Sequence, residues 1–246
     1  MTNEPRLVDK VALVFGGSRG IGAAIVKQLA SDGASVALTY AKSPDKAAET
    51  ARAAEALGVS VIMIKADSAD AEAVTDAVAQ TVARFGRLDI LVVNAGILIR
   101  GTVDTFALED FDRMVATNVR GVFVAIQASA PHLTDGGRII TIGSNTAVRT
   151  AFPGASVYSM TKGAIASLVR GVAIDLAPRG ITVNNIQPGP TATDMTAGLV
   201  EMVKRLVPLG RMGEPDAIAG LVAYLASARA GFVTGSSLTI DGGCVA

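Results

Sequence analysis

The sequence predicts an α/β fold in which a single parallel sheet of about seven strands is covered by helices on both faces. Short apolar runs alternate along the 246 residues with longer, alanine-rich segments that have helical spacing. The apolar runs are hydrophobic at nearly every position, which is typical of strands buried on both faces. Strand–helix alternation at this rhythm forms βαβ units with right-handed crossovers, and therefore a doubly wound sheet.

Each element follows from its local pattern. The runs rich in Val, Ile, Leu and Thr predict strands at residues 10–15, 34–40, 59–67, 88–94, 137–144, 180–188 and 236–242. Apolar residues at helical spacing predict helices at 21–31, 45–57, 69–85, 111–129, 156–177 and 216–227. Residues 188–211 break the rhythm with three prolines and several glycines. We therefore expect one domain over residues 1–246, with a mobile substrate lid at about 190–211.

Composition narrows the class of protein. The formal net charge is zero and no block of like charge occurs, so neither nucleic acid nor a membrane surface is an expected partner. The polar N-terminus and the lack of a long apolar run argue against a signal peptide or a membrane span. The single cysteine, Cys244, fits a cytoplasmic location. One histidine, His132, and one cysteine are too few for a zinc site within one chain.

The loop after the first predicted strand, "VFGGSRGIGAAIV", has the composition of a dinucleotide site. Gly16, Gly20 and Gly22 allow close backbone approach, and the helix that follows offers free N–H groups to a pyrophosphate. The strand–loop–helix context makes this a Rossmann-type motif. The expected contacts from this loop are Gly16, Ser18, Arg19, Gly20, Ile21 and Gly22.

The end of the second predicted strand indicates which dinucleotide is bound. A site for NAD usually has an Asp or Glu there to hold the ribose 2′-OH. This chain has Tyr40, Ala41, Lys42 and Ser43 there, and the first carboxylate after the strand is Asp45. Arg19 and Lys42 would attract a 2′-phosphate. We therefore expect NADP(H), with Tyr40, Lys42 and Ser43 among its contacts.

Tyr158 and Lys162, in "YSMTK", are four residues apart in a predicted helix, so the phenol and the ammonium project from the same face. On a solvated face this pair would have no special chemistry. Beside a cofactor, a fixed ammonium lowers the pKa of the phenol and makes the pair an acid–base device. The glycine loop and Ser144, which closes the fifth predicted strand, favour the second interpretation.

Together with "NAG" (residues 94–96) and "PGPTATDM" (188–195), these motifs resemble the short-chain dehydrogenase/reductase family over nearly the whole chain. The motifs "GGSRGIG", "RGITVNNIQPGP" and "VTGSSLTIDGG" are similar to its bacterial ketoacyl-reductase-like branch. The resemblance implies a carbonyl reductase, reversible as an alcohol dehydrogenase, that forms a homotetramer with its C-terminal "DGGCVA" near a subunit contact.

The resemblance also implies roles for single residues. Tyr158 would be the proton donor, Lys162 would lower its pKa and bind the nicotinamide ribose, and Ser144 would polarise the substrate oxygen. Asn118, in "ATNVRG", would hold a water that continues the proton path. Further cofactor contacts would be Asp67 and Ser68 at the adenine, Asn94, Ala95 and Gly96 at the adenosine ribose, and Pro188, Gly189, Thr191 and Thr193 at the nicotinamide side.

Two departures from the family pattern stand out. Phe15 replaces a threonine that usually fixes the glycine loop by hydrogen bonding. Asp135 stands where family members that act on an acidic carrier protein have a basic residue, although Arg179 could still bind such a partner. A free ketone or aldehyde is therefore the expected substrate.

Two alternatives remain. They are a 3-ketoacyl-carrier-protein reductase, and a regulatory protein of the same fold that binds a cyclic dinucleotide, because "DSAD" (67–70) and "VVNAGI" also resemble that offshoot.

The apolar lid residues either cover a hydrophobic substrate or pack in the core or at a subunit interface. They are Met195, Leu199, Val200, Met202 and Val203.

Overall fold

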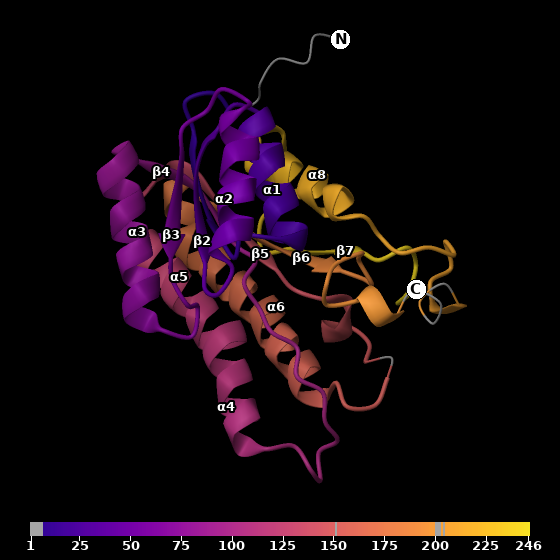
Figure 1. Cartoon of the computed structure of the whole chain (residues 1–246). Helices are drawn as coiled ribbons and strands as arrows, with labels where there is room; N and C mark the ends of the chain where they lie inside the picture. Colours follow the sequence, from indigo (N-terminus) through magenta and orange to yellow (C-terminus); the bar gives the residue numbers. More distant parts are fainter. Residues whose placement is uncertain (1–6, 151, 200–202, 204) are drawn as a thin grey trace.

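The computed structural model describes residues 7–150, 152–199, 203 and 205–246. Its centre is a parallel sheet of seven strands in the order β3-β2-β1-β4-β5-β6-β7 (Figure 1). The strands are β1 (Val11–Phe15), β2 (Ser35–Tyr40), β3 (Val61–Lys65), β4 (Leu88–Val93), β5 (Leu133–Ile142), β6 (Thr182–Pro188) and β7 (Ser237–Ile240). All seven predicted strands are confirmed. The order reverses between β1 and β4, so the doubly wound topology is confirmed as well.

Helices cover both faces of the sheet. On one face α1 (Gly20–Ser31), α2 (Pro44–Glu55) and α8 (Pro215–Ala226) pack on even-numbered residues of β1 such as Val14. On the other face α3 (Ala71–Phe85), α5 (Gly121–Ser129) and α6 (Ser156–Leu176) pack on odd-numbered ones such as Leu13. Both faces of the central strands are therefore buried, which accounts for their continuous hydrophobicity. No helix in the described part of the chain is both long and apolar enough to cross a membrane.

Local chemistry sets the helix ends. Asp70 caps α3 by accepting hydrogen bonds from the N–H groups of Glu72 (2.9 Å) and Ala73 (3.2 Å). Gly86 ends that helix in the left-handed region, with φ of 75°. Pro44 and Pro215 open α2 and α8, where a missing N–H costs nothing.

The predicted helix at 111–129 is wrong in one respect, because the structure divides it into three parts. These are α4 (Leu108–Val115), a π-helical turn (Ala116–Arg120) and α5. A π turn accommodates an extra residue and rotates side chains relative to the α-helical register. Here it buries Thr117 and Asn118, and such turns often occur at functional sites.

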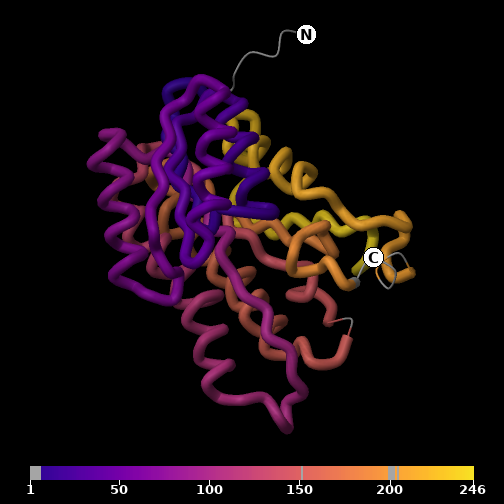
Figure 2. Tube along the Cα trace, viewed as in Figure 1, coloured from indigo at the N-terminus to yellow at the C-terminus, as the bar shows by residue number. Residues whose placement is uncertain are grey.

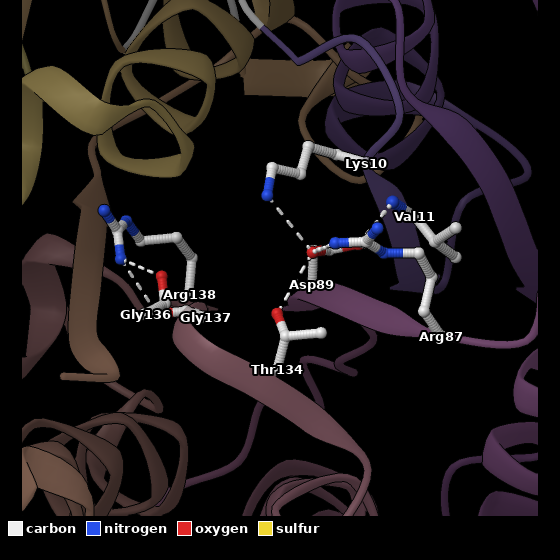
Figure 3. Close-up of polar contacts among 8 residues, drawn as sticks. All are labelled: Lys10, Val11, Arg87, Asp89, Thr134, Gly136, Gly137 and Arg138. Carbon is white, nitrogen blue, oxygen red and sulfur yellow. Dashed lines mark hydrogen bonds and ion pairs between the residues drawn. The ribbon is translucent and has the colours of Figure 1, made fainter. Parts of the chain in front are cut away.

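A buried carboxylate ties together the amino-terminal ends of three central strands. Asp89 is 3% exposed. It accepts hydrogen bonds from Arg87 (2.6 and 2.8 Å), the Val11 N–H (3.0 Å) and the Thr134 hydroxyl (3.0 Å) (Figure 3). The Lys10 Nζ also lies 3.4 Å from Asp89 Oδ1. Burial raises the pKa of Asp89, but these hydrogen bonds outweigh it and hold the pKa below its usual value. This network therefore stabilises the edge of the sheet that lies opposite the predicted site.

The loops after β4 and β5 extend together beyond the carboxyl edge of the sheet (Figure 2). The Gly101 N–H donates to the Gly154 carbonyl at 3.1 Å. The Arg100 guanidinium also lies 4.9 Å from the centre of the Phe152 ring. These contacts hold the loop after β4 against the segment that directly precedes the helix of Tyr158.

Candidate functional site

The structure brings the predicted site residues together at the carboxyl edge of the sheet, because all strands are parallel. Each of the first six strands is followed directly by a predicted group. In strand order these are Gly16–Gly22, Tyr40–Ser43, Asp67–Ser68, Asn94–Gly96, Ser144 and Pro188–Thr193. Tyr158 and Lys162 come from α6, and Asn118 comes from the π turn.

Lys162 and Tyr158 lie one helical turn apart on α6, as predicted. The Lys162 Nζ is 5.7 Å from the centre of the Tyr158 ring and donates to the Ile142 carbonyl at 2.9 Å. Lys162 is only 5% exposed. A Cβ on Gly96 would stand 3.3 Å from the same Nζ, so glycine at this position avoids a tight contact with the ammonium. The pair is therefore not on a solvated face.

The pKa of the phenol differs from the sequence-based expectation. Burial raises the pKa of Tyr158 to about 12, and a hydrogen bond with Ser144 only partly opposes it. Burial also lowers the pKa of Lys162 to about 8. Desolvation disfavours the charged form of each group, the phenolate of Tyr158 and the ammonium of Lys162. Tyr158 is therefore a protonated group at neutral pH, which suits a proton donor.

The Ser144 hydroxyl is oriented by a neighbour that sequence reasoning missed. Ser144 Oγ accepts hydrogen bonds from the Thr146 N–H (3.2 Å) and from the Thr146 hydroxyl (2.9 Å). These bonds occupy both acceptor positions of the oxygen and leave its own O–H to donate. Ser144 thus presents a donor next to Tyr158. The sequence signal was a second hydroxyl two residues after the strand-end serine.

The Asn118 side chain holds two other segments in place. Its Oδ1 accepts from the Ile97 N–H (2.9 Å), and its Nδ2 donates to the Ile97 carbonyl (2.8 Å) and to the Thr161 hydroxyl (3.2 Å). Thr161 in turn donates to the Tyr158 carbonyl at 2.8 Å. Asn118 is fully buried, so it fixes the loop after β4 against the start of α6. One lone pair of Oδ1 remains for a water.

The glycine loop is fixed from two sides. The Gly16 N–H donates to the Thr39 hydroxyl at 3.0 Å, and the Gly16 carbonyl accepts from Asn94 Nδ2 at 2.8 Å. A Cβ on Gly22 would lie 2.0 Å from that carbonyl, so only glycine permits this approach. Thr39, on β2, therefore supplies the hydroxyl that Phe15 lacks. The sequence indicated it only as a buried threonine in an apolar strand.

The two expected phosphate ligands are exposed. Arg19 and Lys42 follow neighbouring strands, β1 and β2, and Ser43 directly precedes α2. Arg19 is not free, because its Nη1 donates to Asp194 at 2.9 Å. Tyr40 is half-buried beside the cluster formed by α1, α2 and α8. The region thus offers two cations and a helix N-terminus to an anion.

The adenine end of the predicted site depends on one glycine. Asp67 is exposed and accepts from the Ala69 N–H at 3.0 Å. A Cβ on Gly121 would lie 2.0 Å from the Ser68 carbonyl. Gly121, the first residue of α5, therefore lets this helix touch the loop after β3. Sequence reasoning missed it, because the contact joins segments that are far apart in the chain.

The segment after β6 is tied to the C-terminus. The Gly189 N–H donates to the Ile240 carbonyl at 3.0 Å, and Thr191 forms a bridge with Gly213. Asp241 accepts from Asn145 Nδ2 at 3.2 Å, which connects the C-terminal residues to the turn after Ser144.

Of the predicted lid residues, Val203 is 2% exposed and packs against Val207, Met212 and Cys244. Met195 is 53% exposed. Val200, Met202 and the Leu199 side chain lie outside the described residues. Val203 thus packs against the protein.

Comparisons with known proteins find relatives that match this chain over nearly its whole length. Residues 16–245 match the family model for enoyl-(acyl carrier protein) reductase. A short-chain dehydrogenase/reductase from Serratia marcescens BCRC 10948 is 56% identical with a TM-score of 0.96, over 98% of this chain and 100% of that one. A short-chain dehydrogenase from Burkholderia cenocepacia J2315, in complex with NADP, is 48% identical with the same TM-score and coverage of 98% and 100%. The cyclic-di-GMP-binding biofilm dispersal mediator protein of Escherichia coli (strain K12) is 42% identical over 236 residues, 95% of this chain and 96% of that protein.

Proposed function

The chain belongs to the short-chain dehydrogenase/reductase family, and from this premise we propose that it reduces a ketone or aldehyde to an alcohol with NADPH, and also runs the reverse reaction. The observation that carries the proposal is the buried Lys162 ammonium, one helical turn from Tyr158 and close to Gly96. We also propose a cytoplasmic homotetramer, in line with the family resemblance.

The residues at the carboxyl edge fit the cofactor. The backbone around Gly16 and Gly22 is closely packed and fixed by Thr39 and Asn94, so its approach to a pyrophosphate is preorganised. Arg19 and Lys42 would hold the 2′-phosphate. Asp67 and Ser68 would contact the adenine, Asn94 to Gly96 the adenosine ribose, Lys162 the nicotinamide ribose, and Pro188, Gly189, Thr191 and Thr193 the nicotinamide side.

When bound, the cofactor supplies the hydride, and the chain handles the proton. Tyr158 donates its phenolic proton to the carbonyl oxygen, since a pKa of about 12 keeps it protonated at neutral pH. Ser144 donates its O–H to the same oxygen and stabilises the charge that builds there. Lys162 then returns a proton to Tyr158, through a path continued by a water on Asn118 Oδ1.

The substrate is a free small molecule in this proposal. Arg179, the cation left to attract an acidic carrier protein, donates to Asp135 at 3.0 Å and to the Ala130 carbonyl at 2.6 Å. Its charge is thus already paired within the chain, which disfavours the carrier-protein alternative.

The test is the oxidation of NADPH and NADH with a panel of free ketones, free aldehydes, acyl thioesters and carrier-bound substrates. We expect turnover of a free carbonyl with NADPH and a strong loss in Tyr158→Phe. Much higher activity on the carrier-bound substrate would favour the ketoacyl-carrier-protein reductase. Equal activity of Tyr158→Phe would remove the proposed acid.

A second candidate function is the binding of a cyclic dinucleotide. It is favoured by the 42% identity to the Escherichia coli relative whose name states cyclic-di-GMP binding. Catalysis is the leading proposal because a pure binder has no need of a buried Lys162 beside Tyr158. Calorimetric titration with cyclic di-GMP tests this candidate, with micromolar binding supporting it and no detectable heat excluding it.

A further inference from the structure

An ion pair joins the glycine loop to the segment after β6. Arg19 Nη1 donates to Asp194 Oδ2 at 2.9 Å, across 175 positions of sequence. Both side chains are largely exposed, at 61% and 76%. The pair therefore stands where an incoming ligand could reach either partner.

The backbone places Asp194 beside the loop independently of Arg19. A Cβ on Gly20 would lie 3.2 Å from Thr193 Cγ2, so the two segments are already in near contact. The Thr193 N–H donates to the Thr196 hydroxyl at 3.1 Å, which closes a turn around Asp194. The Ala192 N–H donates to the Gly213 carbonyl at 2.9 Å and anchors the base of that turn. The backbone at Asp194 is thus held beside the glycine loop.

Arg19 is also the cation that we assign to the 2′-phosphate, and this inference rests on that proposed function. Asp194 engages Nη1, and no other acceptor among the described residues is bonded to the guanidinium, which has further N–H donors. A phosphate on the same guanidinium would lie close to a carboxylate of like charge. NADH carries no 2′-phosphate and would not meet this repulsion.

We propose that Asp194 is a cofactor-selectivity residue that competes with the 2′-phosphate for Arg19. It weakens the binding of NADPH more than that of NADH, which carries no 2′-phosphate. The effect is modest because the pair is exposed, and a change of roughly two- to fivefold in affinity is expected for such pairs. Salt screens it.

Titration calorimetry tests the proposal with two matched ligand pairs, NADPH against NADH and 2′,5′-ADP against 5′-AMP. Asp194→Asn should tighten binding of NADPH and 2′,5′-ADP by roughly two- to fivefold more than binding of NADH and 5′-AMP. The gain should vanish in the Arg19→Ala background and shrink in high salt. Asp175→Asn, which removes another exposed carboxylate, from the last turn of α6, is the charge control.

The outcomes separate this inference from the proposed function. Unchanged or weaker NADPH binding by Asp194→Asn, or an equal gain in Asp175→Asn, would overturn the inference alone. A gain that persists without Arg19 would overturn it as well. Equal binding of NADPH and 2′,5′-ADP by the wild-type protein and by Arg19→Ala would overturn the assignment of Arg19 to the 2′-phosphate, and with it both proposals.

Discussion

The Lys162 ammonium lies 5.7 Å from the centre of the Tyr158 ring, in surroundings that leave the lysine 5% exposed. Burial lowers the pKa of Lys162 to about 8 and raises that of Tyr158 to about 12. Burial of the charged Lys162 therefore destabilises the folded protein, and such a loss of stability is common at active sites.

Lys162→Met should stabilise the protein at neutral pH while it abolishes turnover. The folded pKa of Lys162 is about 8, against an ordinary value of 10.5. At a pH where the lysine is charged in both the folded and the unfolded protein, this difference lowers the free energy of unfolding by up to about 3 kcal/mol. The lost hydrogen bond to the Ile142 carbonyl offsets part of this, so we expect a net gain of about 1–3 kcal/mol at pH 7.

The direction in which stability changes with pH gives a control for the Lys162→Met prediction. Between pH 8 and 10.5 the unfolded state binds the lysine proton and the folded state does not, so the wild-type protein gains stability as pH rises. Urea unfolding from pH 7 to 10 should show the advantage of Lys162→Met shrinking. A variant that is less stable than wild type at every pH would contradict the assignment of a desolvation cost.

Carbonyl reduction should slow above about pH 8, because Lys162 then loses the charge that supports proton return to Tyr158. Tyr158, with a pKa of about 12, stays protonated over this range. The check is the pH profile of kcat in the wild type and in Lys162→Arg, whose cation does not titrate. If the alkaline decline stays at the same pH in an active Lys162→Arg protein, another group is responsible.

Thr146→Val should reduce kcat without weakening NADPH binding, since it removes the hydroxyl that donates to Ser144 at 2.9 Å. A lost hydrogen bond of about 1 kcal/mol corresponds to roughly five- to tenfold in rate. Ser144→Ala should cost more, about a hundredfold. The matched control is Thr102→Val on the exposed loop after β4. Thr146→Val activity equal to that of the control would show that Ser144 needs no such support.

Asp89→Asn should destabilise the fold and leave kcat unchanged, because the carboxylate lies at the opposite edge of the sheet. Removing the charge leaves Arg87 and Lys10 without their shared partner, at a cost of about 2–4 kcal/mol. The folded pKa of Asp89 is lowered, so its contribution is full above about pH 4 and is lost as pH falls through the folded pKa. Acid unfolding should thus be shallower in the variant, and curves parallel to wild type would argue against this linkage.

The sequence predicted the sheet well because each strand carries its own signal. The continuous apolar run at Val11–Phe15 and the glycines that follow it determine both burial and the turn that leads to α1. Parallel order then brings Ser144 and Asn94 to one edge without further information. The pair Tyr158 and Lys162 was predictable because helical spacing fixes a shared face.

What the sequence could not show depends on contacts between distant segments. Thr39 was not predicted to hold Gly16, nor Gly121 to meet Ser68, since neither contact has a local pattern. The π turn at Ala116–Arg120 was missed because its apolar spacing differs little from that of an α-helix over five residues. The raised pKa of Tyr158 reflects burial, which a pair of residue types does not reveal.

The central claim is that the Tyr158 phenol gives the proton to the substrate carbonyl. The most direct measurement is the single-turnover rate of carbonyl reduction in Tyr158→Phe, alongside its affinity for NADPH by calorimetry. The account predicts a rate loss of about 10²- to 10⁴-fold with NADPH affinity within about twofold of wild type. A wild-type rate in Tyr158→Phe, at full occupancy with NADPH, would contradict it.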